Sequence, residues 1–476
     1  MRIRLGIVGL GATAALLVPA QAEANTWRFH ADHVLGTSLD LAVVAKRPLA
    51  GAQAIDAART EIARLDRILS SWRSDSELTA LNAASSLQVS EDLYAVIAAC
   101  ERMRGITGGA FSARVGRLLQ SCDAGMAGRI DTAAVTLDSN TRTITRPRDV
   151  VFTVDGLAKG YIVDRALAAA RCVPGVDGVM VDIGGDLKCW GHAPIGDHWR
   201  IGVADPANPF DNIVPRTQLA VRDQAVATSG ISARGLLTVS PQTGNRTTHV
   251  AQATVLADHA MDADALATAF SVLPPQESLR LADHLPNVAA RIVAPDGQAH
   301  ESARWQSVCA NLPVRNVQLA DAQTPGKWPA GFALNIEYEI PKIVDSIYRN
   351  PYVAIWITDE NRTLVRSLLL LGKETRYREE NYVYWRRFGR LDIAFADSIS
   401  KPTRAPGQYK LKWDGLDDDG NKVPQGKYIL NVEAAREKGG HNVQRIELTL
   451  GTDRITAEAK AEGEAGNVRA TYGRNL

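Results

Sequence analysis

Residues 153–164 are the stretch of this chain with the clearest potential for chemistry. Their sequence, TVDGLAKGYIVD, runs from a β-like segment through Gly156 into a helical one that carries Lys159. Glycine lets a backbone come close to a ligand, and the N–H groups at a helix start attract anions. A lysine at this point can reach a phosphate as a point charge. The stretch therefore predicts a site for a phosphate-bearing, nucleotide-type ligand.

Asp264 and Thr268 form a second candidate pair. They lie four residues apart in a run typical of a helix, so the carboxylate and the hydroxyl face the same side. Each residue also has a plain structural interpretation. Asp264 fits a solvated carboxylate near a helix start, Thr268 a buried helix threonine, and Lys159 a solvated surface lysine. Taken singly, these residues leave both interpretations open.

The pattern between Trp27 and about Cys309 indicates the scaffold that must position these residues. Short β-like runs alternate there with helical stretches. Thr37–Ala45 is typical of a strand, and Ala52–Leu69 has apolar residues at the three- and four-residue spacing of a helix. We therefore expect an α/β (α+β) domain over residues 25–310.

A second unit is predicted after a polar linker at residues 311–327. We expect an all-β, Ig-like sandwich over residues 328–455, followed by a polar tail at residues 456–476. The sandwich is predicted from short runs rich in β-branched and aromatic residues and separated by turns. These runs are Phe332–Tyr338, Tyr352–Ile357 and Tyr428–Ala434.

Metal-binding patterns elsewhere in the chain are weak. Residues 413–421 are rich in Asp and Gly, so a calcium-binding loop is one interpretation of this segment. An EF-hand loop would need a distal Glu where this chain has Gln425, so a hairpin turn is favoured. The cysteines lack C-x-x-C spacing, which argues against a zinc site and leaves any disulfide pairing open. They are Cys100, Cys122, Cys172, Cys189 and Cys309.

Residues 1–24 have the features of a secretory signal peptide. Two early arginines precede an apolar run from Leu5 to Pro19, and small residues follow it. We expect cleavage between Ala24 and Asn25. A dinucleotide-like G-x-G-x-x-A pattern at residues 9–14 lacks the acidic partner and the βαβ context of a Rossmann fingerprint.

The composition is that of a soluble globular protein with two or three domains. Of its 476 residues, 45% are hydrophobic and 22% are charged. Removing residues 1–24 leaves 52 basic and 52 acidic side chains. This balance gives no indication of nucleic acid or a charged membrane surface as a partner. Apart from the signal, no apolar run is long enough to span a bilayer.

Five motifs in the first domain together resemble the FAD:protein FMN transferases, the ApbE-type flavinyltransferases of the bacterial cell envelope. The likeness covers roughly residues 27–300, and the motifs follow the family's order and spacing. They are His33–Thr37; Ser70–Trp72 with Ser74–Leu78 and Leu81-Asn82; Thr107–Phe111; Thr153–Asp164 with Gly184–Asp186; and Ala227–Gly230 with Asp264–Thr268. About residues 328–450 resemble an envelope β-sandwich family of unknown function found behind such domains.

The resemblance implies that FMN moves from FAD to a Ser or Thr hydroxyl of a periplasmic acceptor protein. AMP would be released, and Mg²⁺ would bind the pyrophosphate. The metal ligands implied are the side chains of Asp264 and Thr268 and the backbone carbonyl of Gly156. Positions that match nucleotide contacts of the family are Leu35, Trp72, Gly109, Ala110, Phe111, Thr153, Lys159 and Val239. An aromatic at position 72 could stack on a purine, with core packing as the alternative for Leu35 and Trp72.

The chain departs from the family pattern on one wall of the expected site. Relatives often carry His and Asp where this chain has Leu237 and Ser240, and many have Asp at Thr153. Loss of an imidazole removes a candidate for proton transfer, a contribution on the order of 10²–10⁴-fold in rate. Two other functions therefore stay open. One is a periplasmic protein that binds or hydrolyses FAD without transfer, and the other is an interaction module of an envelope redox complex. The sequence identifies no catalytic base.

Overall fold

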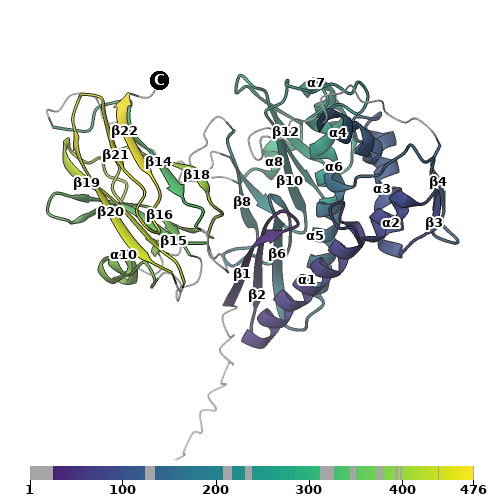
Figure 1. The fold of residues 1–476 in the computed structure, drawn as a ribbon, viewed down its shortest axis with the longest axis horizontal. Coiled ribbons are helices and arrows are strands. Elements are labelled where there is room, and N and C mark those ends of the chain that lie inside the picture. The colour runs from purple at the N-terminus through teal and green to yellow at the C-terminus, as the bar shows by residue number, and fades with distance from the viewer. Residues whose placement is uncertain are drawn as a thin grey trace, which may run out of the picture.

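The computed structural model describes residues 25–123, 134–206, 217–230, 239–310, 326–343, 350–372, 379–391, 395–396, 399–401, 403–437 and 439–474. The expected signal peptide and Leu237 lie outside these residues. Figure 1 shows a unit of helices packed on a sheet, followed by a unit built mainly of strands. Within the described residues, no helix has the length and apolar character needed to cross a membrane.

The first unit is organised around one eight-stranded sheet with the order β1-β2-β6-β7-β10-β11-β12-β13. Every neighbouring pair in it is antiparallel. Its strands are β1 (Asn25–Val34), β2 (Thr37–Ala45), β6 (Val176–Ile183), β7 (Asp186–Gly191), β10 (Ala225–Gly230), β11 (Gln252–Ala257), β12 (Ala289–Val293) and β13 (Ala299–Glu301). The domain is therefore α+β, and its described strands contain no parallel βαβ unit of the Rossmann type.

Helices cover one face of this sheet (Figure 1). They include α1 (Pro48–Leu69), α2 (Glu77–Ala83), α3 (Glu91–Ile106), α5 (Asp155–Arg171) and α6 (Ala260–Phe270). Leu39, Leu41 and Val43 alternate along β2 and pack in the helical core, whereas Ala42 and Val44 belong to a separate cluster. That second cluster includes residues of β8 (Trp199–Val203), β9 (Thr217–Val221) and α8 (Trp305–Val308). The predicted strand at 37–45 and helix at 52–69 are both confirmed.

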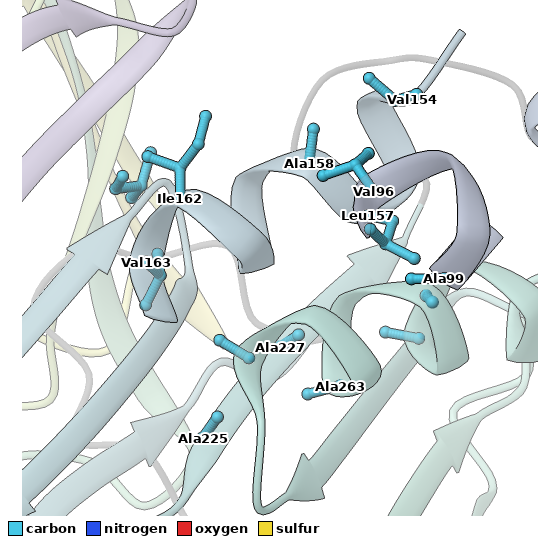
Figure 2. Packing of buried hydrophobic residues seen from close by; sticks show 14 of the residues in the cluster. Val96, Ala99, Val154, Leu157, Ala158, Ile162, Val163, Ala225, Ala227 and Ala263 are labelled. Atoms are coloured by element: carbon cyan, nitrogen blue, oxygen red, sulfur yellow. The ribbon is translucent and has the colours of Figure 1, made fainter. Parts of the chain in front are cut away.

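Helix α5 lies at the centre of the helical layer and is lined mostly by small or β-branched side chains. Figure 2 shows its residues Leu157, Ala158 and Ile162 among side chains from neighbouring elements, including Val96 of α3 and Ala263 of α6. Small side chains allow two helix backbones to approach closely. A Cβ atom at Gly160 would lie only 2.2 Å from the carbonyl oxygen of Ala260, so only glycine fits there. This approach fixes the crossing of α5 and α6.

The second unit is a two-sheet β-sandwich, as the sequence predicts. One sheet has the order β18-β14-β22-β21 and the other β17-β16-β15-β19-β20. Trp328 packs edge-on against Trp413 and Tyr472, with ring centroids 4.9 and 5.2 Å apart. The strands of the sandwich are β14 (Phe332–Ile340), β15 (Tyr352–Asp359), β16 (Leu364–Leu371), β17 (Ser400–Lys401), β18 (Gly407–Trp413), β19 (Gly426–Ala435), β20 (His441–Leu450), β21 (Ile455–Ala459) and β22 (Val468–Arg474).

The segment expected as a polar tail is instead part of the sandwich. β22 pairs with β14 on one side and with β21 on the other, and Tyr472 is fully buried. The prediction was wrong because charged residues alternate with buried ones in this segment. Glu458 and Arg469, for example, form an exposed ion pair across β21 and β22. Such alternation is typical of a strand with one solvated face.

The Asp-rich segment is a hairpin turn, the interpretation the sequence favoured. Leu416 and Lys422 form a β-bridge, and the Asn421 N–H donates to the Asp417 carboxylate at 2.7 Å. Asp418 accepts hydrogen bonds from the N–H and hydroxyl of Ser367.

Among the described side chains the cysteines are free thiols: Cys100, Cys172, Cys189 and Cys309.

Candidate functional site

The candidate site is built on the first two turns of α5. The segment that leads into this helix is clamped by Asn82, whose amide bonds the backbone N–H and C=O of Phe152 at 2.9 and 2.8 Å. The next residue, Thr153, donates its N–H to the Ala113 carbonyl at 2.8 Å. These contacts determine where α5 begins, and therefore where Gly156 and Lys159 lie.

The predicted metal ligands meet where α6 crosses α5. The Thr268 hydroxyl lies 3.5 Å from the carbonyl oxygen of Gly156, and the Asp264 carboxylate accepts the N–H of Gly160 at 3.1 Å. In an α-helix the N–H of residue 160 is the usual donor to the carbonyl of residue 156. Asp264 is only 2% exposed, so the interpretation as a solvated carboxylate is wrong. Asp264, Thr268 and Gly156 thus belong to one helix crossing.

Lys159 pairs with a buried carboxylate from the sheet. Its ammonium group donates to Asp186, which is 2% exposed, while the lysine side chain is 22% exposed. Asp186 begins β7 directly after the Gly184-Gly185 turn. Lys159 is therefore not a solvated surface lysine. Its ammonium group is held on the sheet side of α5.

The β1–β2 turn lies beside the Gly184-Gly185 turn and brings Leu35 to this end of the sheet. The Gly184 N–H donates to the Ser38 carbonyl at 3.0 Å, and a Cβ atom at Gly184 would overlap the Thr37 side chain. Leu35 is half-buried against the helical core and has φ 51°, a conformation that costs energy for a residue other than glycine. Such strain is common where backbone shape serves binding.

Trp72 lies in the loop between α1 and α2, and its side chain is 91% exposed. Core packing, the alternative for this residue, is therefore wrong. The neighbouring Ser71 hydroxyl donates to the Asp155 carboxylate at 2.9 Å, which ties this loop to the first residue of α5. An exposed indole offers a large flat surface that a planar ligand can cover.

The glycine-rich turn after α3 approaches α5 from a further side. Gly108 and Gly109 have positive φ, and the Phe111 N–H donates to the Thr107 hydroxyl at 3.0 Å. The Phe111 ring packs close to Gly156, with its Cε2 atom 3.3 Å from where a Cβ would stand. Ala110 and Phe111 are buried, so their side chains anchor the turn in the core.

Val239 belongs to a short loop that contacts the same glycine turn. Val239 forms a bridge with Arg246, and the Gln242 amide donates to the Gly108 carbonyl at 2.6 Å. Ser240 is buried, and its hydroxyl accepts the Thr243 N–H at 3.4 Å. Ser240 thus has a structural role within the loop.

The two fully buried thiols among the described residues, Cys100 and Cys189, are not activated as nucleophiles. Burial raises the pKa of the Cys100 thiol, and the charges of Glu101 and Asp264 raise it further. Burial likewise raises the pKa of Cys189. Both thiols are therefore neutral near pH 7 and are poor nucleophiles. The groups that converge are hard oxygens, one lysine and glycine-rich backbone, a set suited to a phosphate and a hard cation.

Two polar contacts of this region were not predicted from the sequence. The pairing of Asp186 with Lys159 was signalled only by the motif Gly184–Asp186. The contact of Gln242 with Gly108 was not predicted. By contrast, the predicted residues fall on α5, on segments that contact it, or on two segments, the β1–β2 turn and the loop at 239–246, that contact those segments. The segments that contact α5 are the β6–β7 turn, the loop after α1, the turn after α3, and α6.

Comparison with known proteins gives a consistent result. A model of the ApbE family matches residues 35–292, more than half of the chain. A model described as "Predicted periplasmic protein (DUF2271)" matches residues 333–467. The chain is 28% identical over 319 residues to the FAD:protein FMN transferase of Treponema pallidum, covering 57% of this chain and 86% of that protein. It is 27% identical over 307 residues to the one from Vibrio cholerae, covering 58% and 90%.

Solved structures share the fold of the first unit. The ApbE protein from Thermotoga maritima superposes with a TM-score of 0.54 at 24% identity, covering 60% of this chain and 99% of that one. The apo flavinyl transferase ApbE of Pseudomonas stutzeri gives a TM-score of 0.51 at 22% identity, with 60% and 99% covered.

Proposed function

Because the chain belongs to the ApbE family, we propose that it is a transferase that moves FMN from FAD to a Ser or Thr hydroxyl of a periplasmic acceptor protein. The carrying observation is the convergence of oxygen donors and Lys159 on the first turns of α5. The periplasmic location is supported by the description of the second family and by the signal-like residues 1–24. We assign catalysis to residues 25–310 and treat 311–327 as a linker to the sandwich.

The reaction breaks one bond of the FAD pyrophosphate. The acceptor hydroxyl oxygen forms a bond to the phosphorus of the FMN half, and the bond from that phosphorus to the bridging oxygen breaks. AMP leaves with the bridging oxygen, and the hydroxyl proton is lost. Positioning and charge neutralisation are the main contributions that a protein makes to phosphoryl transfer of this kind. We name no residue of this chain as the base.

The residues at the α5–α6 crossing fit Mg²⁺. A carboxylate, a hydroxyl and a carbonyl are hard oxygen donors, and Mg²⁺ takes few protein ligands when substrate phosphates complete its shell. We propose that Asp264, Thr268 and the Gly156 carbonyl hold it. When bound, the ion neutralises charge on the phosphoryl oxygens. The Gly160 N–H orients the Asp264 carboxylate, which keeps one oxygen fixed against α5.

Lys159 would hold a phosphate of FAD while Asp186 keeps its ammonium group in place. We propose the remaining contacts from their common location around α5. Trp72 would cover a planar ring of FAD, and Leu35 would line the pocket at the end of the sheet. Thr153 would lie beside the proposed metal ligands. The turn at Gly109, Ala110 and Phe111, together with Val239, would close the opposite side.

FAD hydrolysis without transfer to protein is the second candidate, favoured by one observation. Ser240 stands where relatives often carry Asp, and its buried hydroxyl is used inside its own loop. A site without that carboxylate could bind FAD and pass the phosphoryl group to water. A role as a pure interaction module would need neither FAD binding nor turnover.

One assay separates these functions. Purified protein is incubated with FAD, Mg²⁺ and an extract of periplasmic proteins, and covalent flavin is detected by fluorescence on a denaturing gel and by intact mass. Transfer predicts an acceptor heavier by one FMN and an equal amount of AMP. Release of AMP and free FMN without a labelled protein would favour hydrolysis. Asp264→Asn serves as the matched inactive control, and equilibrium dialysis with FAD tests the interaction-module alternative.

A further inference from the structure

Asp164, on the third turn of α5, joins three elements through one carboxylate. Its Oδ1 atom accepts the Lys188 ammonium at 2.6 Å and the Ala260 N–H at 3.2 Å. Its Oδ2 atom accepts the Met261 N–H at 3.0 Å. The side chains of Asp164 and Lys188 are 16% and 14% exposed, so the group is largely shielded from solvent. α5, α6 and β7 therefore meet at this residue.

The contact supplies α6 with a cap that its own sequence lacks. The helix begins after His259, which makes no side-chain capping bond. The first N–H groups of a helix need partners, and a carboxylate there is also favoured by the helix dipole. Asp164, which lies on a different helix, provides both the hydrogen-bond acceptors and the negative charge. Substituting a capping residue by Ala typically costs about 0.5–2 kcal/mol.

Two ion pairs of opposite polarity set the register between α5 and β7. Lys159 on the helix pairs with Asp186 on the strand, whereas Asp164 on the helix pairs with Lys188 on the strand. Asp186 and Lys188 lie two residues apart and so point to the same face of the sheet. Sliding or reversing α5 would bring like charges together. The pairs therefore specify one position of the helix.

The seating of α6 is transmitted directly to the proposed metal ligands. Ala260, whose N–H is capped, contacts the backbone of Gly160 so closely that no side chain fits between them. Asp264 lies one helical turn after Ala260, and it accepts the N–H of that same Gly160. We propose that Asp164 is a positioning residue for the magnesium site. It holds the start of α6 so that Asp264 and Thr268 face Gly156.

The metal part of this inference depends on the proposed function, so its test has two arms. In the first, amide hydrogen exchange at the start of α6 is measured without FAD or metal. In the second, the Mg²⁺ concentration for half-maximal FAD turnover is measured. The variants are Asp164→Ala and Asp164→Asn. The control is Asp262→Asn. Asp262 lies on the same turn of α6 as Ala260 and Met261, and the substitution removes its 2.6 Å ion pair with Arg102 of α3.

We expect Asp164→Ala to speed exchange at Ala260 and Met261 at least about tenfold and to raise the half-saturating Mg²⁺ concentration roughly 10–100-fold, as for other outer-shell partners of a metal. Turnover at saturating Mg²⁺ should change far less. Asp164→Asn, which keeps one acceptor oxygen, should lie between Asp164→Ala and the wild type. Asp262→Asn, which removes a first-turn charge but no hydrogen bond to the Ala260 or Met261 N–H, should change both quantities less than Asp164→Ala does.

Three outcomes overturn the inference. Unchanged exchange in Asp164→Ala would show that this residue does not hold α6. Faster exchange with an unchanged Mg²⁺ requirement would reduce Asp164 to a helix cap with no positioning role. A wild-type protein without Mg²⁺-dependent turnover would overturn the proposed function and the metal part together. The exchange arm would then still decide whether Asp164 seats the helix.

Discussion

The Thr268 hydroxyl lies 3.5 Å from the Gly156 carbonyl oxygen, across the point where α6 crosses α5. Four residues earlier on α6, Asp264 meets the N–H of Gly160. The crossing thus presents a hydroxyl, a carbonyl and a carboxylate from two helices whose backbones touch. Because the two backbones are in contact, the spacing of these oxygens follows from the packing of the two helices.

Asp264→Asn should remove magnesium-dependent turnover while keeping the fold. The amide retains an oxygen for the Gly160 N–H, so the melting temperature should stay close to that of the wild type. The rate should fall by more than the roughly 10–100-fold typical of an outer-shell partner. Initial rates across a Mg²⁺ series and a thermal melt check both points. Turnover at the wild-type level would remove Asp264 from the proposed ligands.

Lys159→Met should cost more stability than Asp186→Asn. The methionine leaves Asp186 buried without its ammonium partner, whereas the asparagine removes the buried charge and leaves Lys159 partly solvated. Breaking a fully buried pair costs about 3–5 kcal/mol, and we expect on the order of 2 kcal/mol because Lys159 is 22% exposed. Chemical denaturation of the two variants measures this difference. The reverse order would contradict the burial argument.

Gly160→Ala should destabilise the first domain, whereas Gly105→Ala should not. A Cβ at Gly160 would stand 2.2 Å from a backbone oxygen, and overpacking of this kind typically costs about 1–3 kcal/mol or more. Gly105 is also helical, yet a Cβ there meets nothing within 4 Å. Its replacement should be neutral or stabilising by up to about 1 kcal/mol. Equal destabilisation by both variants would argue against the close approach of α5 and α6.

Asp418→Asn should flatten the pH dependence of the sandwich. Burial raises the pKa of Asp418 above its usual value of 3.8, despite hydrogen bonds from Ser367 and the charge of Arg366. The folded state therefore binds this proton more tightly than the unfolded state. The free energy of unfolding should consequently fall as pH rises from about 4 through the folded pKa. Denaturation of the sandwich at several pH values tests this slope, and an unchanged slope in Asp418→Asn would contradict the burial argument.

Trp72→Ala should weaken FAD binding without lowering stability. The indole is 91% exposed and so contributes little to the core. Loss of an aromatic stack costs about 0.5–1.5 kcal/mol, which corresponds to a few-fold up to about tenfold in affinity. Equilibrium dialysis with FAD and a thermal melt provide the two readouts. An unchanged affinity would remove Trp72 from the proposed pocket.

Local secondary structure could be predicted from the sequence, whereas contacts between residues far apart in the chain could not. The spacing of Asp264 and Thr268 predicts a shared helix face because the helical period is local. That Asp164 caps the start of α6 could not be inferred, because the partners are separated by 96 positions in the chain. The exposure of Trp72 likewise depends on a loop whose path is set by Ser71 and Asp155. The last strands were missed because alternating charges resemble a tail when their pairing partner is unknown.

The pairing of β14 with β22 has a consequence for how the protein is made. Residues 332–340 gain this neighbour in their sheet only when residues 468–474 are available, and pairing across such a separation is slow. During synthesis from the N-terminus, we expect the transferase unit to form while the sandwich is still incomplete. Completion of the sandwich would then be the late event of maturation, and removal of β22 should leave a folded first unit joined to an aggregation-prone, unpaired strand edge.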